Sequence, residues 1–512
     1  MSKPRVRFAP SPTGPLHIGG VRTALYNYLY AKQTGGTFIL RIEDTDQARY
    51  VPGAEEYIKE SLEWFGLTPD EGPGYGGDYG PYRQSERKDL YAKYALQLVK
   101  EGKAYYAFDT TEELDKMRAD MEAKGVHSAK YNYDTRGQMK NSLTLPADEV
   151  TTLLTSDTPY TIRLKVPQDE TISFTDAVRE QVSFQSNELD DKIILKGDGM
   201  PTYHLANIVD DHLMEITHVV RGEEWLSSTA HHVLMYQFFG WESPTFAHLP
   251  LILKPTGKGK LSKRDGAKFG FPVFPLEWNQ EGEDTYAGFR EDGYLPEAVI
   301  NFLALLGWNP GNDEEMFSID ELIKIFDPSR IVKSGARFDV EKSRWFNQQY
   351  IIKTSDEDLA DILAPMAGQQ GINANRQYLI SFVNLMKERV ERLPEFFTGG
   401  GFFFAAPTEY DAKTIRKKYK VENEPHFRHM IHGLRDMGQF TANSAETFVK
   451  SYIADHELSF GQVLPILRVA LSGSMAGPDL FQTMELLGQA EVLNRMEAGI
   501  DYFHKSKTET DA

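Results

Sequence analysis

The first hundred residues alternate between short apolar runs and amphipathic segments. Residues 6–8, V-R-F, are typical of a short buried strand, and from position 18 apolar side chains recur every three or four residues, as on one helix face. A second apolar run covers residues 37–42, and helical periodicity returns near 54–65 and 90–99. Alternating strands and helices are typical of α/β proteins, so we predict a parallel sheet with helices packed on it.

The pattern changes after about residue 105. Polar helical stretches dominate residues 105–189, and one segment at 160–166 alternates as a half-exposed strand does. Apolar runs return at 193–195 and 215–220, and the second of them leads directly to Arg221. We therefore predict that an inserted domain interrupts the α/β domain.

Helical periods dominate the last third of the chain, as at 379–397 and 464–471, and only the tail from 505 is expected to be disordered. The last third is therefore predicted to be all-helical. The predicted boundaries are 1–104 and 190–242 for the split α/β domain, 105–189 for the insert, 243–340 for a connecting region, and 341–512 for the helical part.

Composition narrows the class of protein. The formal net charge of −19 argues against a general nucleic-acid binder, so an RNA partner would have to meet local basic patches. The chain has no cysteine, which excludes disulfides, thiol nucleophiles and cysteine-ligated zinc. No stretch approaches the ~20 apolar residues of a membrane span, and no leader is recognisable before the first strand. A cytoplasmic, monomeric enzyme is expected.

Residues 10–20, P-S-P-T-G-P-L-H-I-G-G, join the first strand to the first helix. Prolines hold such a turn extended, and a helix N-terminus presents free backbone N–H groups to anions. Gly19 and Gly20 would let a nucleotide approach the backbone, and His17 can donate to phosphate oxygens. Alone, H-x-G-G fits a tight turn with a solvent-facing histidine equally well; the surrounding sequence favours a nucleotide site.

A basic loop follows the apolar run 249–253. Five basic residues lie between positions 254 and 264, among glycines, and end in Lys260-Leu261-Ser262-Lys263-Arg264. A mobile cationic loop suits a pyrophosphate leaving group, because phosphoryl chemistry depends on positioning and charge stabilisation. By itself the loop would be interpreted as a solvated charge run.

In this order the two segments resemble those of class I aminoacyl-tRNA synthetases, and the chain resembles the bacterial-type glutamyl-tRNA synthetases over nearly its whole length. The segments that carry the resemblance are residues 7–20, 41–46, 80–87, 201–207, 220–225, 260–264, 295–298 and 305–308. The resemblance implies a Rossmann-like catalytic domain, an inserted α/β domain that binds the tRNA acceptor end, a stem-contact region and an all-helical anticodon-binding part.

The resemblance also implies a reaction. Glutamate and ATP would give glutamyl-adenylate and pyrophosphate, with Mg²⁺ accompanying ATP, and the glutamyl group would then pass to the 3′ end of tRNA-Glu. The implied catalytic residues are His17 and Lys263. The implied amino-acid site consists of Arg7, Ala9, Ser11, Glu43, Tyr203, Asn207, Arg221 and Trp225. The implied ATP site consists of Gly19, Gly20, Glu224, Ile252, Lys260, Ser262 and Lys263.

Residue chemistry agrees with these roles. Glu43 stands at a strand end and suits the substrate ammonium, whereas Arg7 and Arg221 suit carboxylates through their planar, bidentate geometry. Each has a structural alternative: Glu43 could form a surface pair with Arg41, and Arg221 could pair with a neighbouring glutamate. Tyr203 and Trp225 could be core aromatics, and the histidines at 231 and 232 are interpreted as structural. Joint placement at strand ends, where α/β folds bind ligands, favours the functional interpretation.

The chain departs from its relatives in two places. Some relatives hold zinc through cysteines in the insert, but residues 104–108 are A-Y-Y-A-F here, so no zinc is expected. Residues 270–288 form a long excursion after the basic loop, rich in aromatic residues and interpreted as a structural insert.

Two rivals within the superfamily remain open at this stage. Glutaminyl-tRNA synthetases are expected to end in β-barrels, and tRNA-modifying glutamyl transferases are expected to lack an anticodon-binding half. For anticodon reading, Arg389 is the candidate and Arg392 its competitor; a solvated charged helix face is an equally good interpretation.

Overall fold

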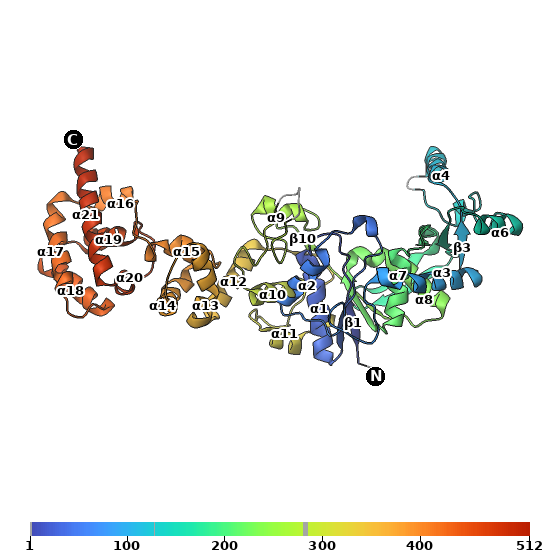
Figure 1. Ribbon diagram of the computed structural model, residues 1–512, viewed down its shortest axis with the longest axis horizontal. Helices are drawn as coiled ribbons and strands as arrows, with labels where there is room; N and C mark the ends of the chain where they lie inside the picture. The colour runs from blue at the N-terminus through green and yellow to red at the C-terminus, as the bar shows by residue number, and fades with distance from the viewer. Residues whose placement is uncertain (1–2, 127–128, 280–284, 512) are drawn as a thin grey trace. The chain divides into compact units, whose positions relative to one another are not determined.

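The computed structural model describes residues 3–126, 129–279 and 285–511 (Figure 1). The chain divides into an N-terminal unit, Met1–Glu291 with Val299–Val340, and a C-terminal unit, Asp292–Ala298 with Glu341–Ala512. In the part of the chain that is described, no helix has the length and apolarity needed to cross a membrane.

A six-stranded sheet forms the centre of the N-terminal unit, in the order β2-β1-β8-β9-β5-β6. Neighbouring strands are parallel except for the β5–β6 hairpin. The strands are β1 (Arg5–Phe8), β2 (Thr37–Leu40), β5 (Thr171–Asp176), β6 (Glu180–Gln185), β8 (His218–Gly222) and β9 (Thr245–Leu249). The predicted parallel α/β sheet is confirmed.

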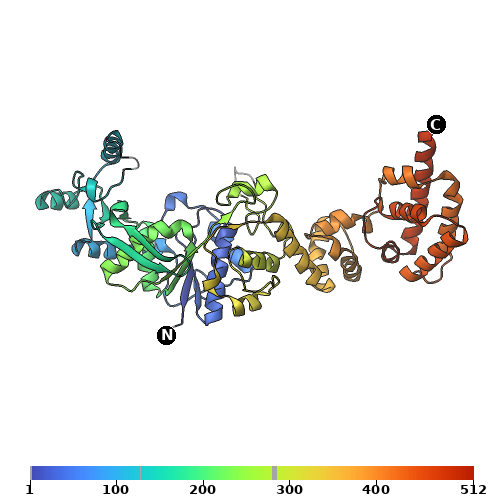
Figure 2. The same ribbon diagram turned by 180° about the vertical axis from the view of Figure 1, so that it is seen from behind.

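Helices pack on this sheet, and α1 lies directly beside β1 (Figures 1 and 2). The helices of this part of the chain are α1 (Ile18–Thr34), α2 (Ala54–Trp64), α3 (Lys88–Lys100), α7 (Tyr203–Leu213) and α8 (Leu226–Phe239). Of these, α1 contacts β1, β2 and β8, and α8 contacts β5. Helix α1 begins after the proline-rich turn and ends at Gly35, whose φ of 63° is a left-handed conformation that glycine adopts without strain. Because α1 follows β1, its N-terminus stands at the carboxyl end of the sheet.

The residues predicted as an insert divide between two sheets. Strands β3 (Ala104–Ala107), β4 (Thr161–Leu164) and β7 (Ile193–Leu195) form a separate antiparallel sheet, accompanied by α4 (Thr111–Ala123), α5 (Tyr133–Arg136) and α6 (Ala147–Thr155). The β5–β6 hairpin instead extends the central sheet. Its alternation buries Ile172 and Phe174 in the same core as Phe246 of β9. Residues 193–195, expected to resume the parallel sheet, belong to the insert's sheet.

The connecting region is built from short elements. It contains β10 (Ile252–Leu253), α9 (Lys263–Phe269), α10 (Pro296–Leu305), α11 (Ile319–Ile325) and β11 (Ala336–Arg337). The apolar run 249–253 divides at Pro250 into the last residue of β9 and the whole of β10, because proline lacks the N–H that a continuous strand requires.

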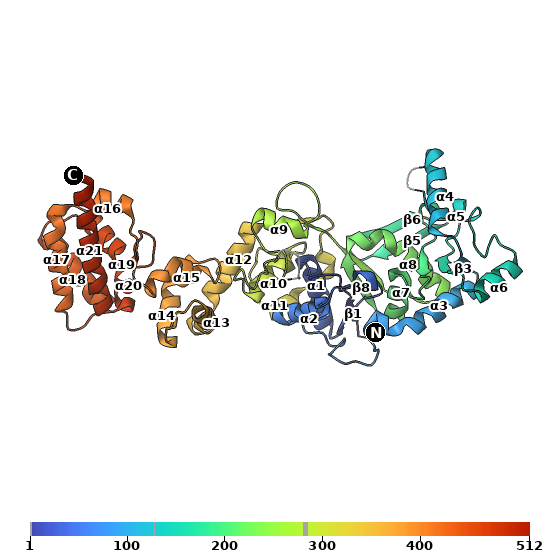
Figure 3. The same ribbon diagram turned by 45° about the horizontal axis from the view of Figure 1, so that its top comes forward.

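The described residues of the C-terminal unit form helices joined by loops, with no strand among them, and in Figure 3 helices α17, α18, α19 and α21 form one packed group. Its helices are α12 (Val340–Lys353), α13 (Asp356–Gln369), α14 (Arg376–Met386), α15 (Glu395–Gly400), α16 (Ala412–Lys418), α17 (Glu424–Arg435), α18 (Ala442–Asp455), α19 (Phe460–Ser472), α20 (Leu480–Leu487) and α21 (Gln489–Asp511). Of the tail expected to be disordered, residues 505–511 continue α21, which Phe503 anchors in the core, and residue 512 lies outside the described residues.

Short 3₁₀ helices complete the chain. They are η1 (Gln47–Arg49), η2 (Gln84–Arg87), η3 (Ser186–Glu188), η4 (Glu223–Trp225), η5 (Pro328–Arg330), η6 (Lys387–Arg389), η7 (Gly401–Phe403) and η8 (Val421–Asn423).

Candidate active site

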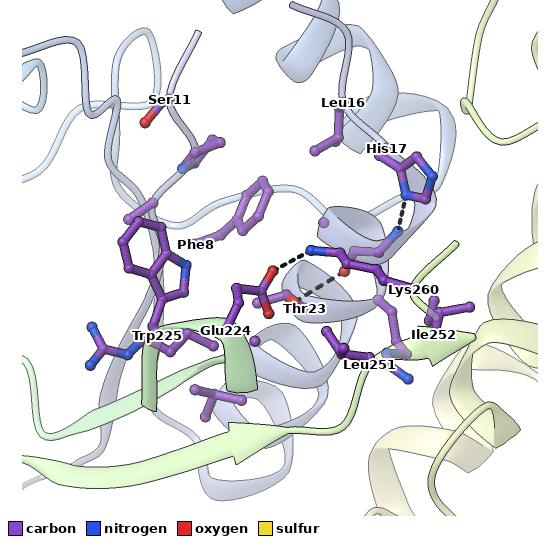
Figure 4. Close-up of a pocket in the computed structure, with 18 of the residues that line it drawn as sticks. Phe8, Ser11, Leu16, His17, Thr23, Glu224, Trp225, Leu251, Ile252 and Lys260 are labelled. Atoms are coloured by element: carbon purple, nitrogen blue, oxygen red, sulfur yellow. Dashed lines mark hydrogen bonds and ion pairs between the residues drawn. The ribbon is translucent and has the colours of Figure 1, made fainter. Parts of the chain in front are cut away.

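A cavity of about 560 Å³ opens where the carboxyl ends of β1 and β8 meet the N-terminus of α1 (Figure 4). All residues for which a catalytic, amino-acid or ATP role was predicted line it: Arg7, Ala9, Ser11, His17, Gly19, Gly20, Glu43, Tyr203, Asn207, Arg221, Glu224, Trp225, Ile252, Lys260, Ser262 and Lys263. Ser11 and Trp225 lie toward one side of the view, and His17 and Lys260 toward the other. The structure thus brings the predicted site together; the individual roles stay predictions.

His17 is the N-cap of α1, and its ring is held in one orientation. Its Nδ1 accepts a hydrogen bond from the backbone N–H of Gly19 at 3.1 Å. Burial, together with the cations Lys260 and Lys263, lowers the pKa of His17 to about 4. The ring is therefore neutral near pH 7, and its proton sits on Nε2. That atom is buried and has no hydrogen-bond partner among the described residues, so its N–H is available to donate to a bound ligand.

The helix N-terminus differs from the open anion-binding corner that the sequence predicted. The N–H of Ile18 donates to the carbonyl of Val273 at 3.0 Å, and that of Gly20 to the carbonyl of His17 at 2.8 Å. With Gly19 bonded to the His17 side chain, the first three N–H groups of the helix are occupied. An anion at this corner would therefore meet side-chain donors before backbone ones.

The basic loop supplies such donors. Lys260 pairs with Glu224 at 2.6 Å, a contact drawn in Figure 4, and Lys263 is the first residue of α9. Ser262 caps that helix through Asp265, which also pairs with Lys254 at 3.2 Å. The loop is thus held by ion pairs of Lys254 near its start and of Lys260 near its end. Two lysines accordingly reach the same part of the cavity as His17.

A buried ionic chain of Arg7, Asp211, Arg41 and Glu43 lies at the Arg7 and Glu43 side of the cavity. Arg7 binds both oxygens of Asp211, at 3.0 and 3.2 Å, and Arg41 bridges Asp211 at 2.7 Å and Glu43 at 2.9 Å. Asn207 donates to the same Glu43 oxygen at 3.1 Å. The alternative of a surface pair between Arg41 and Glu43 is wrong, because Arg41 is fully buried.

This chain is electrically balanced, with two arginines and two carboxylates. Burial raises the pKa of Glu43, and the arginines oppose this shift only partly. Burial also acts on Asp211, but Arg7 and Arg41 together lower its pKa overall. A second cation near Glu43, such as a substrate ammonium, would complete the compensation of this carboxylate.

Arg221 is surrounded differently. Its Nε donates to His248 Nε2 at 3.1 Å, one Nη donates to the Tyr203 hydroxyl at 2.9 Å, and the other donates to Thr229 Oγ1 at 2.8 Å. His232 Nδ1 lies 3.2 Å from the same Nη. In the portion of the chain that is described, no carboxylate lies within ion-pair distance of Arg221. The predicted alternative, pairing with Glu223 or Glu224, is wrong because those carboxylates bind Arg179 and Lys260.

The two histidines beside Arg221 are neutral. Burial lowers the pKa of His232 well below its ordinary value, and Arg221 acts in the same direction. Burial also lowers the pKa of His248, although its Nδ1 binds Asp176 at 2.5 Å. Both rings therefore turn a lone pair toward the guanidinium, whose positive charge stays uncompensated by its immediate neighbours.

Two aromatic residues border this end. Tyr203 and Trp225 lie with ring centroids 4.3 Å apart at an interplanar angle of 34°, and Trp225 is 38% exposed. Tyr203 touches Arg221 through its hydroxyl, so it is more than a core aromatic. Trp225 stands at the mouth, where it can cover a ligand.

Sequence reasoning missed several members of this site: Arg41 as a bridge, Asp176, Asp211, Thr229, His232 and His248. A signal existed for some of them. Asp211 follows Asn207 by four residues on α7, and hence lies on the same helix face. His248 interrupts the apolar strand β9, where a buried polar residue needs a partner. Asp176 gave a similar signal, since the alternation of β5 places it on the same buried face as Ile172 and Phe174, but its partner, 72 residues away, could not be predicted.

Arg389 lies in the C-terminal unit, outside this cavity. It is exposed at the end of η6. Helix α14 ends at Met386, so the alternative of a continuous charged helix face does not describe this segment. Arg392 is engaged by Asp292 at 2.7 Å and Glu395 at 3.0 Å, whereas no ion pair of Arg389 occurs among the described residues.

The described residues contain no cluster of three or more histidine, cysteine, aspartate or glutamate side chains arranged to hold a metal ion. His231 Nε2 donates a hydrogen bond to the backbone carbonyl of Asp190 at 2.9 Å instead of joining His232. The cavity's own carboxylates, Glu43 and Glu224, are already committed to Arg41 and Lys260.

Comparison with known proteins identifies the class. Residues 3–345 match the family of class I tRNA synthetases (E and Q), catalytic domain, and residues 358–500 match an anticodon binding domain family. The chain belongs to the class I tRNA synthetases.

Similar proteins of known sequence and structure identify the family within this class. The glutamate–tRNA ligase of Christiangramia forsetii is 54% identical over 98% of this chain and 99% of its own length, and that of Flavobacterium johnsoniae is 53% identical over 97% and 98%. The crystal structure of a glutamate tRNA ligase from Elizabethkingia meningosepticum, in complex with its amino acid, superposes with a TM-score of 0.95 at 50% identity, covering 98% of this chain and 99% of that one. Within its class, the chain belongs to the glutamate–tRNA ligase family.

Proposed function

We propose that the cavity is the site where this glutamate–tRNA ligase joins L-glutamate to AMP before passing it to tRNA-Glu. The observation that carries the proposal is the division of the cavity into two chemically different ends. One end holds Arg221 with an uncompensated charge beside the balanced Glu43 chain. The other holds a neutral histidine with an unpartnered donor and two lysines.

Each charged group of glutamate has a partner of opposite charge at the end of the cavity that holds Arg221 and Glu43. Its ammonium pairs with Glu43, and its carboxylates face Arg221 and the remaining donors of Arg7. Adding one ammonium and two carboxylates brings one net negative charge, which the charge of Arg221 balances. Glutamine, which lacks the second carboxylate, leaves that buried guanidinium without an anion, and this favours glutamate.

ATP matches the second end. Its adenosine lies beside Glu224 and Ile252, and Gly19 and Gly20 let it approach the backbone. His17 Nε2–H and the ammonium groups of Lys260 and Lys263 stabilise the charge that develops when the substrate carboxylate attacks the α-phosphate. No protein nucleophile takes part. Magnesium fits as an ion held by the triphosphate and water, since the cavity's carboxylates already have partners.

Transfer to tRNA then needs contacts at both ends of the RNA. We assign the acceptor end to the insert, the stem to the connecting region around residues 243–340, and anticodon contacts to the helical C-terminal unit with Arg389. The absence of strands from the described residues after 340 supports this assignment over a glutaminyl-tRNA synthetase, expected to end in β-barrels. The large helical unit disfavours a tRNA-modifying transferase.

The test is competitive charging of purified tRNA-Glu and tRNA-Gln with labelled glutamate and labelled glutamine. We expect glutamyl-tRNA-Glu as the main product, dependent on ATP. Charging with glutamine at a comparable rate would contradict the proposed role of Arg221.

A further inference from the structure

Residues 271–278, here called the aromatic segment, lie in the excursion after the basic loop. Phe271, Phe274, Leu276 and Trp278 are all buried. The segment is fixed to α2 through Tyr57, whose hydroxyl donates to the Leu276 carbonyl at 2.5 Å and accepts from the Leu276 N–H at 3.1 Å. Trp278 packs edge-on against the Tyr57 ring, with centroids 5.1 Å apart. The segment is therefore packed into the N-terminal unit through hydrogen bonds and ring contacts with Tyr57.

The aromatic segment also contacts the N-terminus of α1. The Val273 carbonyl accepts the N–H of Ile18 at 3.0 Å, which is the first N–H of the helix. The Val273 carbonyl thus accepts from an N–H that could otherwise bind a phosphate oxygen. The same bond holds Ile18, the residue after His17, in place.

Phe274 contacts both predicted catalytic residues. Its ring meets the His17 ring in a T-shaped arrangement with centroids 6.1 Å apart, and the Lys263 ammonium lies 5.8 Å from its centroid. Phe274 is 1% exposed and is not among the residues that line the cavity, so it lies behind them. A ring face attracts a cation at this distance, and a ring shields an imidazole from water.

From these contacts we infer that the aromatic segment forms the back wall of the phosphate end, and that Phe274 is a positioning residue for His17 and Lys263. The inference rests on the proposed roles of those two residues. It gives the excursion a function in adenylate formation, in place of the structural insert predicted from the sequence.

The physical reason concerns the protonation state of His17. Nδ1 can accept from Gly19 N–H only while it is unprotonated, and this bond orients the ring. The shielding that Phe274 contributes to keeps the pKa of His17 low, in addition to Lys260 and Lys263, with Asp265 acting in the opposite direction. If water reached the ring, the histidine would gain a proton at mildly acidic pH, lose the Gly19 bond and turn away from the phosphates.

The experiment compares Phe274→Ala with Phe271→Ala as a matched control. Phe271 belongs to the same segment and is equally buried, but it stacks on Phe338, with centroids 4.5 Å apart, on a different side. The readouts are the titration midpoint of His17 in ¹³C-histidine NMR, assigned by the signal lost in His17→Ala, and the pH profile of glutamate-dependent pyrophosphate exchange with tRNA present.

In Phe274→Ala we expect the His17 midpoint to rise from about 4 toward the ordinary 6.5, so that exchange at pH 6 falls relative to pH 8, by at most roughly fourfold because Lys260 and Lys263 still lower the pKa. Phe271→Ala is expected to leave the midpoint near that of the unmodified protein. Phe274→Leu, which preserves apolar volume, serves if the alanine variant does not fold, with a smaller shift in the same direction.

An unchanged midpoint in the Phe274 variants, or the same shift in Phe271→Ala, would overturn the inference. Failure of the proposed function gives a separate result: His17→Ala would then retain normal exchange. If His17→Ala loses exchange but the Phe274 variants leave the His17 titration midpoint unchanged, only the positioning role of Phe274 is rejected, and the proposed role of His17 stands.

Discussion

Asp176 binds His248 Nδ1 at 2.5 Å, and through this bond a residue of the β5–β6 hairpin determines which His248 nitrogen faces Arg221. Asp176 is fully buried and also accepts from the N–H groups of Val178 and Arg179, so its position is fixed by its own turn. With the His248 proton held on Nδ1, Nε2 is free to accept from Arg221. The hairpin thereby supports the Arg221 end of the cavity.

Replacing Asp176 by asparagine tests this support. The asparagine amide can donate to His248 Nδ1, which moves the ring proton to Nε2 and sets it against the Arg221 N–H at 3.1 Å. We expect the KM for glutamate to rise about tenfold or more, the scale of one frustrated buried hydrogen bond, with the KM for ATP unchanged. Asp190→Asn is the control, because Asp190 neighbours His231, which has no bond to Arg221. Equal changes in both KM values would contradict the relay.

Arg221→Gln tests amino-acid choice directly. The substitution keeps two N–H donors but removes the charge that the neutral neighbours leave uncompensated. An unmatched buried charge costs several kcal/mol, so the preference for glutamate over glutamine should fall by roughly a hundredfold or more. Competitive charging with both labelled amino acids measures the ratio. Full discrimination by the variant would remove Arg221 as the reader of the side-chain carboxylate.

The catalytic pair makes a different prediction. His17→Ala and Lys263→Ala should each slow adenylate formation by roughly a hundredfold or more, the scale of losing one transition-state donor. Glutamate affinity should hardly change, because neither residue belongs to the ionic chain around Glu43. Pyrophosphate exchange and glutamate binding by calorimetry separate the two effects. Near-normal exchange in either variant would show that these residues are not the phosphate donors.

Metal dependence follows from the side chains available. We expect activity to survive a zinc-selective chelator, because no cysteine exists in the sequence, and to require magnesium with ATP. Elemental analysis of the purified protein, together with activity before and after chelation, checks both statements. Stoichiometric zinc that is lost together with activity would contradict the prediction.

Local features of this protein could be predicted from its sequence, whereas contacts between residues far apart in the chain could not. The strand–turn–helix around His17 was predictable, because apolar spacing and prolines are local signals. Membership of the cavity was predictable by resemblance. The partners were not: Arg7 meets Asp211 across 204 residues, and His248 meets Asp176 across 72, so only the folded sheet brings them together. The occupied N–H of Ile18 was unpredictable for the same reason, since its acceptor lies in the excursion.

The final prediction concerns Arg389. It is exposed at the end of η6 and forms no ion pair within the described residues, so its guanidinium can bind a splayed base or a phosphate without breaking an internal contact. Arg392, held by Asp292 and Glu395, would first have to give up two carboxylates. We therefore expect Arg389→Gln to change the relative charging of tRNA-Glu and tRNA-Gln, while pyrophosphate exchange with saturating tRNA stays intact. Arg376→Gln is the control, as Arg376 is an exposed arginine of the same unit paired with Asp361. If Arg389→Gln leaves the tRNA ratio where Arg376→Gln leaves it, Arg389 does not read the anticodon.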